Sequence, residues 1–194
     1  MKTPELLPRI ARLLPDYDIH AYGSREIGYR YPRIKGLLFP DYDLGNAVAK
    51  ASNLTWHGGF KAFADLPLER FDAFLYTSLY DGIPNVLLEA GAHQLPIVAP
   101  MIGGIGELIS EETGWPVRNP YDAREYAERL REAMEVPAEA VARADALASL
   151  IAQRHSFQTF CRSVSELVTA CQGSIRLRPA APLPRPAACA AHRL

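Results

Sequence analysis

Apolar positions along the chain follow two spacings that alternate from one segment to the next. Residues 3–14 carry apolar side chains three or four positions apart, which predicts an amphipathic helix with Thr3 as N-cap and Pro4 at the first helical position. Short apolar runs bounded by Gly, Pro or Ser predict strands at 17–23, 53–59, 72–78, 96–100 and 113–117. Strands separated by helical segments indicate an α/β fold, a parallel sheet with helices on both faces.

Helical spacing dominates the last third of the sequence. Asp122 and Glu125 have the spacing of a capping box at the start of a helix, and further helices are predicted at 137–155 and 156–171. Residues 173–194 contain four prolines and no apolar period, which predicts a disordered tail. The predicted organisation is therefore one domain over residues 1–172, followed by a tail over 173–194.

Composition narrows the possible partners. A net charge of −1 with 48% hydrophobic residues gives no electrostatic reason to expect nucleic acid or a membrane surface as the main partner. No apolar run approaches the roughly 20 residues of a transmembrane helix, and no secretory signal is evident. Three widely spaced cysteines favour a reducing, cytoplasmic location.

The segment 79–96, LYDGIPNVLLEAGAHQLP, combines a turn with an apolar helix and is the strongest candidate for a binding site. Ligands of open parallel sheets bind where strands end and helices begin. The turn is expected to offer the N–H groups of Gly82, Ile83, Asn85 and Val86 at the positive end of the helix dipole, which suits phosphate or diphosphate. Pro84 has no N–H, but its fixed φ preorganises the first turn.

Two acids lie eight residues apart in this segment, Asp81 in the turn and Glu89 in the helix. Glu89 shares a helical stripe with Asn85 and His93 and could accept hydrogen bonds from a ribose diol while phosphates occupy the helix start. The same stripe is also what the solvated face of an ordinary amphipathic helix looks like, and Asp81-Gly82 is a common turn dipeptide. Spacing alone favours this second interpretation.

The stretch YTSLYDGIPNVLLEAGAHQLPIVAPMIGGIGELI, residues 76–109, resembles the donor-binding segment of GT-B glycosyltransferases of the family 4 (group 1) type. That family carries a Glu-x7-Glu motif, matched here by Asp81-x7-Glu89, and then a Pro-Val-Val-like strand and a Gly-Gly loop. The resemblance extends from Lys2 to about Ala170. It implies the C-terminal, Rossmann-like half of a GT-B fold and a glycosyltransferase that moves a sugar from a nucleotide-diphosphosugar to an alcohol acceptor.

The resemblance also implies roles for individual residues. Asp81 and Glu89 are the catalytic candidates: Asp81 would contact the donor sugar and Glu89 the ribose. Gly82 and Ile83 amides would hold sugar or phosphate oxygens, beside Pro84 and Asn85. The remaining donor-binding candidates are Lys2, Gly23 and Phe60, where Lys2 would neutralise phosphate, or is simply a terminal residue, and the other two would lie near the base. No metal or separate cofactor is implied, and the acceptor would be a sugar or a lipid-linked molecule.

Several features depart from the family pattern. Asp81 is one methylene shorter than Glu, and Gln94 stands at a helix end where the family usually has Gly, so a strained left-handed C-cap is expected. The N-terminal domain and the first strand, which lies in the middle of such sheets, have no counterpart. We therefore expect a truncated product or one half of a split enzyme. The alternative is a non-catalytic donor-binding module that completes a separate N-terminal subunit. Either would be cytoplasmic, with a peripheral location at the inner membrane face as the alternative.

Other motifs are weaker. The Asp-x-Asp pairs at 16–18 and 41–43 fit turn carboxylates better than a metal site. The loop IGGIGELI lacks a full dinucleotide fingerprint, so close packing or donor approach explains it better than NAD. The histidines show no ligand spacing, and no zinc site is predicted.

Overall fold

The computed structural model describes residues 3–23 and 44–172 of the chain. Their contacts divide the chain into two compact units, Met1–Ser156 and Phe157–Leu194. The predicted tail at 173–194 and the second Asp-x-Asp pair lie outside the described residues.

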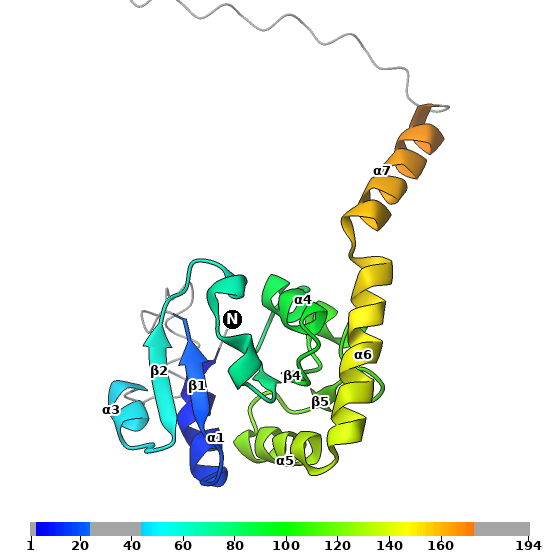
Figure 1. Cartoon of the computed structure of the whole chain (residues 1–194). Helices are drawn as coiled ribbons and strands as arrows, with labels where there is room; N and C mark the ends of the chain where they lie inside the picture. Colours follow the sequence, from blue (N-terminus) through cyan, green and yellow to red (C-terminus); the bar gives the residue numbers. More distant parts are fainter. Residues whose placement is uncertain (1–2, 24–43, 173–194) are drawn as a thin grey trace, which may run out of the picture. The chain divides into compact units, whose positions relative to one another are not determined.

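Helices and strands alternate through the first unit (Figure 1). The strands are β1 Ile19–Tyr22, β2 Leu54–Gly58, β3 Phe74–Leu75, β4 Ile97–Pro100 and β5 Trp115–Val117. The α-helices are α1 Leu7–Leu13, α3 Leu44–Ala49, α4 Asn85–Ala92, α5 Ala123–Glu135 and α6 Pro137–Arg154, and short 3-10 turns are η1 Pro4–Leu6, η2 Phe63–Asp65, η3 Leu68–Arg70 and η4 Gly103–Glu107. All five predicted strands are present, although β3 is only two residues long.

Every strand pairing is parallel, as predicted, but the strands form two sheets. β1 pairs with β2, and β3, β4 and β5 form a separate sheet in that order. Within the described ranges, no backbone hydrogen bond joins β1 to β3. Among the described residues, β1 and β3 therefore each have one side without a partner strand.

Helices cover both faces of the three-stranded sheet. Alternate residues of β4 point to opposite sides of the sheet, so they contact different helices. Val98 packs with residues of α1 and α5 in one core cluster. Ile97 and Ala99 pack with α4 and α6 in another. All four residues of β4 are buried, as expected for the central strand of a sheet covered on both faces. The predicted α/β architecture with helices on both faces is confirmed.

Two helix starts differ from their predictions. Thr3 is the N-cap residue of the first helical turn, but its hydroxyl makes no capping bond. Its backbone instead contacts the end of β3, since Thr3 N–H donates to the Thr77 carbonyl and the Thr77 hydroxyl donates to the Thr3 carbonyl. Asp122 caps α5 as predicted. The capping box is wrong, however, because Glu125 accepts from the amides of residues 118 and 119 rather than from the cap.

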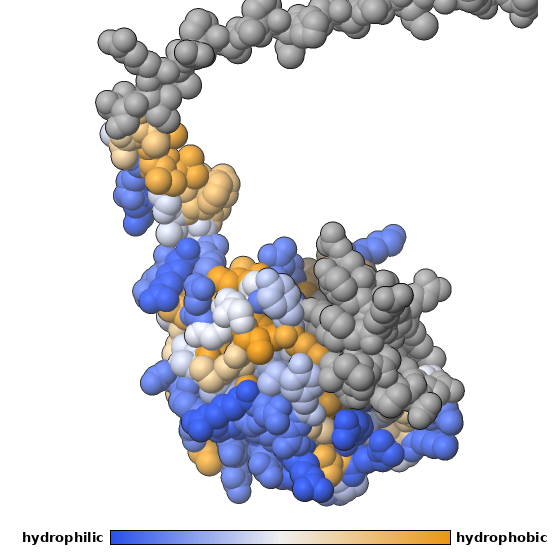
Figure 2. Space-filling view, turned by 180° about the vertical axis from the view of Figure 1, so that it is seen from behind, coloured by the Kyte–Doolittle hydropathy of each residue, from blue (hydrophilic) through white to orange (hydrophobic). Residues whose placement is uncertain are grey.

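The second unit contains helix α7, Phe157–Gln172. Its large apolar side chains are exposed and recur at helical spacing. They are Phe157, Phe160, Val164, Leu167 and Val168. Figure 2 shows the apolar colour of this stripe along the helix.

Candidate donor-binding site

The predicted strand–turn–helix is present at the carboxyl edge of the three-stranded sheet. Tyr76, directly after β3, donates its N–H to the Val98 carbonyl, which extends the parallel pairing by one residue. The chain then passes through the buried Thr77 and Ser78 into the turn that precedes α4. This turn therefore occupies the position where parallel sheets bind ligands.

Asp81 is held in this turn by two hydrogen bonds within the protein. The Tyr76 hydroxyl donates to Asp81 Oδ2 at 2.5 Å, and the Gly82 amide donates to Asp81 Oδ1 at 3.1 Å. Burial, followed by the hydrogen bond to Asp81, raises the pKa of Tyr76 well above its usual value. The expectation that the Gly82 amide is free is wrong for this structure, because the neighbouring carboxylate accepts its hydrogen bond.

The Gly-Gly loop after β4 packs directly onto this turn. Gly103 has φ +49°, and a Cβ atom there would overlap the carbonyl oxygen of Asp81. A Cβ at Gly104 would lie 2.8 Å from Cγ1 of Ile83. Both positions therefore require glycine, which supports the close-packing interpretation of this loop.

The start of α4 offers backbone donors, as predicted for most of its residues. Pro84 is the N-cap residue, buried and with φ −70°, so its ring fixes the entry to the helix. Among the described residues, the N–H groups of Ile83, Asn85 and Val86 have no acceptor. Three adjacent donors at the positive end of a helix favour an anion.

Glu89 lies on the exposed face of α4, as do Asn85 and His93, while Leu87 and Ala90 are buried. Its carboxylate forms no hydrogen bond or ion pair with any residue in the described part of the chain. This placement agrees with the stripe predicted from spacing. The roles of Asp81 and Glu89 toward a ligand stay predictions.

The remaining predicted site residues lie apart from α4 in the sequence. Gly23 ends β1 with φ +136°, donates to the Gly58 carbonyl and accepts from the Trp56 indole N–H, so it closes the end of the two-stranded sheet. Phe60 follows β2 and is exposed. Lys2 lies outside the described residues.

Two residues at the site were missed from the sequence, Tyr76 and Ser78. Tyr76 is 5% exposed, and Ser78 is fully buried with its hydroxyl donating to the Tyr80 carbonyl. A signal for Tyr76 did exist, because a buried tyrosine needs an acceptor and Asp81 is the next carboxylate along the chain after it.

Gln94, which follows the C-cap residue of α4, is in the left-handed region with φ +57°, as expected at a place where the family usually has glycine. It is the only non-glycine residue with positive φ in the described part of the chain. Its amide donates to Asp145 of α6 at 2.6 Å. The same part of the chain holds no group of three or more side chains able to bind a metal ion, and none of its helices is long and apolar enough to cross a membrane.

Solved structures share this fold. Sucrose-phosphate synthase from Thermosynechococcus elongatus matches with TM-score 0.68 and 22% identity, over 90% of this chain and 43% of that one. Alr3699/HepE from Anabaena, solved in complex with UDP-glucose, matches with TM-score 0.70 and 19% identity, over 87% of this chain and 45% of that one. This chain therefore spans less than half the length of either protein.

A solved structure of a single domain is covered to a larger extent. The C-terminal domain of a group 1 glycosyl transferase, LpcC from Francisella tularensis, matches with TM-score 0.57 and 20% identity, over 79% of this chain and 77% of that one. A comparison with curated proteins gives no match. The model of the family described as "Glycosyl transferases group 1" matches residues 8–135. That match covers more than half of the chain and confirms the predicted family: the chain belongs to the group 1 glycosyl transferases.

Proposed function

We propose that this chain is the nucleotide-diphosphosugar-binding half of a GT-B glycosyltransferase, which transfers a sugar to an alcohol acceptor. The observation that carries the proposal is the start of α4, where the unaccepted N–H groups of Ile83, Asn85 and Val86 lie between two acids at the carboxyl edge of a parallel sheet. Membership of the family supports a donor-binding role for this arrangement. Alr3699/HepE, which has the same fold, was solved with UDP-glucose.

In this proposal each part of the site binds one part of the donor. The amides at the start of α4 bind the diphosphate, Glu89 accepts hydrogen bonds from the ribose hydroxyls, and Asp81 accepts from a sugar hydroxyl. When the bond to the sugar breaks, negative charge grows on the departing diphosphate. Fixed amide donors and the helix dipole stabilise that charge, which lowers the barrier to transfer.

A polypeptide carrying the N-terminal half is proposed as the partner. β1 and β3 belong to two separate sheets, each with parallel pairing, and a strand between them would join the five strands into one sheet. The bond from the Thr3 amide to the Thr77 carbonyl places the start of the first helix at the carboxyl end of β3. A strand that runs beside β3 and leads into that helix would end there.

Hydrogen exchange tests the open edges. The amides of Phe74 and Tyr76 donate to carbonyls of residues 96 and 98, so the Leu75 amide between them faces the open side and is expected to exchange much faster than the Phe74 amide. Equal protection of these two amides would contradict the proposed place for an additional strand.

A second candidate function is a donor-binding module without activity of its own. The coverage of less than half of the two longer structures favours it, because the acceptor-binding part of a GT-B enzyme is not among the described residues. For a lipid-linked acceptor, peripheral association with the inner membrane face is proposed. The exposed apolar stripe of α7 supports that association.

Calorimetry with UDP, GDP and their hexose conjugates, together with an assay of donor hydrolysis, tests the donor-binding proposal. Glu89→Gln is expected to weaken nucleotide affinity at least about tenfold, since the ribose would lose hydrogen bonds to a charged acceptor. Glu128→Gln on the exposed side of α5 is the matched control and should leave affinity unchanged.

The outcomes separate the candidates. Binding with slow hydrolysis favours an enzyme half, and binding without any turnover favours the module. A folded sample that binds no nucleotide, or equal affinity in wild type and Glu89→Gln, would count against both.

A further inference from the structure

Tyr76 has no role among the functions assigned so far, yet its hydroxyl makes a short contact to a proposed ligand-binding acid. We propose that Tyr76 is a positioning residue, which fixes the Asp81 carboxylate so that it recognises a hydroxyl of the donor sugar. This inference rests on the proposed donor-binding function. It adds a determinant of sugar recognition that lies outside the turn.

Tyr76 is held in place by its backbone and by the packing of its ring. Its backbone is bonded to β4 through Val98, and its ring belongs to the core cluster that includes Leu87 and Ile97. With only 5% of the residue exposed, the ring cannot swing away without opening that core. The hydroxyl is therefore presented to Asp81 from a rigid support.

The hydroxyl remains a donor over the whole physiological range. Burial and the neighbouring carboxylate both raise the pKa of Tyr76, so the phenol keeps its proton. The bond to Asp81 Oδ2 at 2.5 Å is then an O–H donating to a carboxylate, a strong type of hydrogen bond. Asp81 is consequently oriented before any ligand arrives.

An oriented carboxylate can still bind a ligand. Each oxygen has two lone pairs, and the Tyr76 hydroxyl and the Gly82 amide use one on each oxygen. The Asp81 side chain is only partly buried, so a remaining lone pair can accept from a sugar hydroxyl. Holding the acceptor in place removes the cost of ordering it on binding, and limits which hydroxyl can reach it.

The backbone beneath Asp81 is held as well. Gly103 approaches the Asp81 carbonyl so closely that no side chain fits between them. Tyr76 therefore controls the direction of the carboxylate, while the Gly-Gly loop controls the position of the backbone. Removing the hydroxyl of Tyr76 should affect the sugar and leave the diphosphate site, formed by the amides of α4, intact.

Wild type is first screened with two ligand pairs, UDP-glucose with UDP and GDP-mannose with GDP, to show which nucleotide base binds. The test then compares the affinity for the sugar conjugate with the affinity for the free diphosphate of that base. In wild type the sugar conjugate is expected to bind more tightly than the free diphosphate. Tyr76→Phe is expected to reduce this advantage about fivefold or more, with unchanged affinity for the free diphosphate. General damage to the fold would weaken both ligands equally.

Tyr126→Phe is the matched control. Tyr126 is buried like Tyr76, and among the described residues its hydroxyl has no hydrogen-bond partner. The same atom is removed from the same type of residue, on α5 in the other core cluster, so no change in either affinity is expected.

A double-mutant cycle completes the test. In an Asp81→Ala background, Tyr76→Phe should cause no further loss of sugar discrimination, because the residue it positions is already absent. Equal discrimination in Tyr76→Phe and wild type, or additive losses in the double mutant, would overturn the inference while leaving donor binding in place. A wild-type chain that binds no nucleotide sugar would overturn the proposed function and this inference together.

Discussion

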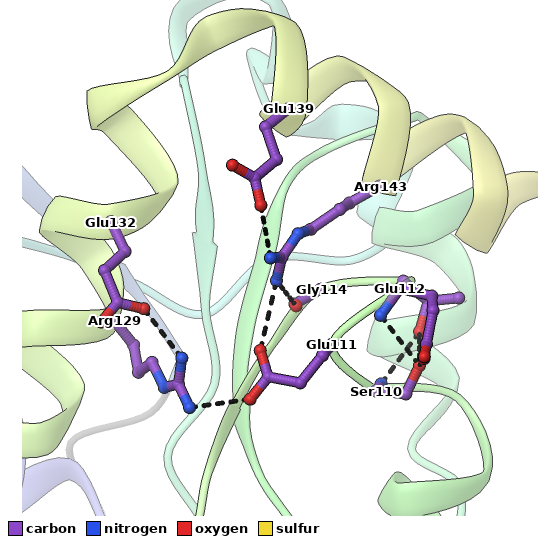
Figure 3. A network of polar contacts seen from close by, with 9 residues as sticks. Ser110, Glu111, Glu112, Gly114, Arg129, Glu132, Glu139 and Arg143 are labelled. Carbon is purple, nitrogen blue, oxygen red and sulfur yellow. Dashed lines mark hydrogen bonds and ion pairs between the residues drawn. The ribbon is translucent and has the colours of Figure 1, made fainter.

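The two edges of the three-stranded sheet use their charged residues in opposite ways. At the carboxyl edge, Asp81 and Glu89 form no ion pair with any described residue, and three backbone donors find no acceptor in the same part of the chain. At the amino edge, carboxylates are paired with arginines in a continuous network (Figure 3).

The amino-edge network joins the loop before β5 to α5 and α6. Glu111 accepts from Arg129 at 2.8 Å and from Arg143 at 3.4 Å. Arg143 also donates to the Gly114 carbonyl at 2.7 Å and to the Glu139 carboxylate. Its Cζ atom lies 4.6 Å from the centroid of the Trp115 ring. One arginine thus connects a loop, a strand and a helix.

The comparison indicates that the amino edge contributes to the stability of the fold, whereas the carboxyl edge offers polar groups to a ligand. Charges that pair with each other cannot also bind a ligand, whereas acids without an ion pair and amides without an acceptor at a rigid turn can. Four predictions test the sheet and its two edges.

The largest effect is expected from Gly103→Ala at the carboxyl edge. The new Cβ would overlap the Asp81 carbonyl, and alanine disfavours the φ of +49°, so the free energy of unfolding should fall by about 3 kcal/mol. Urea denaturation measures the loss. Gly106→Ala in the same turn is the control, because a Cβ there meets no atom within 4 Å. Equal stability of the two variants would mean that the loop does not press on the turn.

Arg143→Met should damage the amino edge alone. The variant keeps the aliphatic packing but loses the bonds to Gly114, Glu111 and Glu139, and a loss of about 2 kcal/mol in the free energy of unfolding is expected. Nucleotide affinity, measured by calorimetry, should not change. A drop in affinity at unchanged stability would refute the division between the edges.

Alkaline pH should weaken the fold through Tyr76 and Tyr126. Burial is the first cause of the raised pKa of both residues, joined at Tyr76 by Asp81 and at Tyr126 by Glu125. Their stabilisation is complete below the unfolded pKa of 10.0 and declines as the pH rises above it toward the folded pKa. For each of the two tyrosines, the free energy of unfolding should fall by about 1.4 kcal/mol between pH 9 and pH 11.

Denaturation curves at pH 9 and pH 11 check this contribution. In Tyr76→Phe and in Tyr126→Phe, the fall in unfolding free energy between pH 9 and pH 11 should be smaller than in wild type by the contribution of one tyrosine. A decline as steep in either variant as in wild type would show that the substituted tyrosine does not stay protonated in the folded state.

The smallest effect is expected from Gln94→Gly at the end of α4. Glycine relieves the left-handed conformation, at about 1 kcal/mol, but removes the exposed hydrogen bond to Asp145, so a net gain of about 0.5 kcal/mol is predicted. The thermal midpoint should rise slightly. Gln94→Ala, which keeps the strain and loses the bond, should lower it.

The sequence determined the order of the elements and the turn before α4. Five apolar runs between Gly, Pro and Ser predicted the five strands. The signal is strongest for β4 and β5, in which every residue is buried, so neither face of the strand needs polar side chains. The exposed stripe of Asn85, Glu89 and His93 followed from the helical repeat, and the left-handed Gln94 from the glycine that the family usually has at this helix end. These features depend on residues that are neighbours in the chain.

Only the tertiary structure decided which groups meet across the sequence. The split between β1 and β3, the contact of Gly103 with Asp81, and the use of Glu125 by the loop after β5 instead of a capping box all depend on how separate segments are brought together. Even Tyr76, five residues from Asp81, reaches it only because the pairing of β3 with β4 fixes its backbone. Local patterns set the period of an element, but the partner of each polar group is chosen when the packed elements exclude water and leave one acceptor within reach.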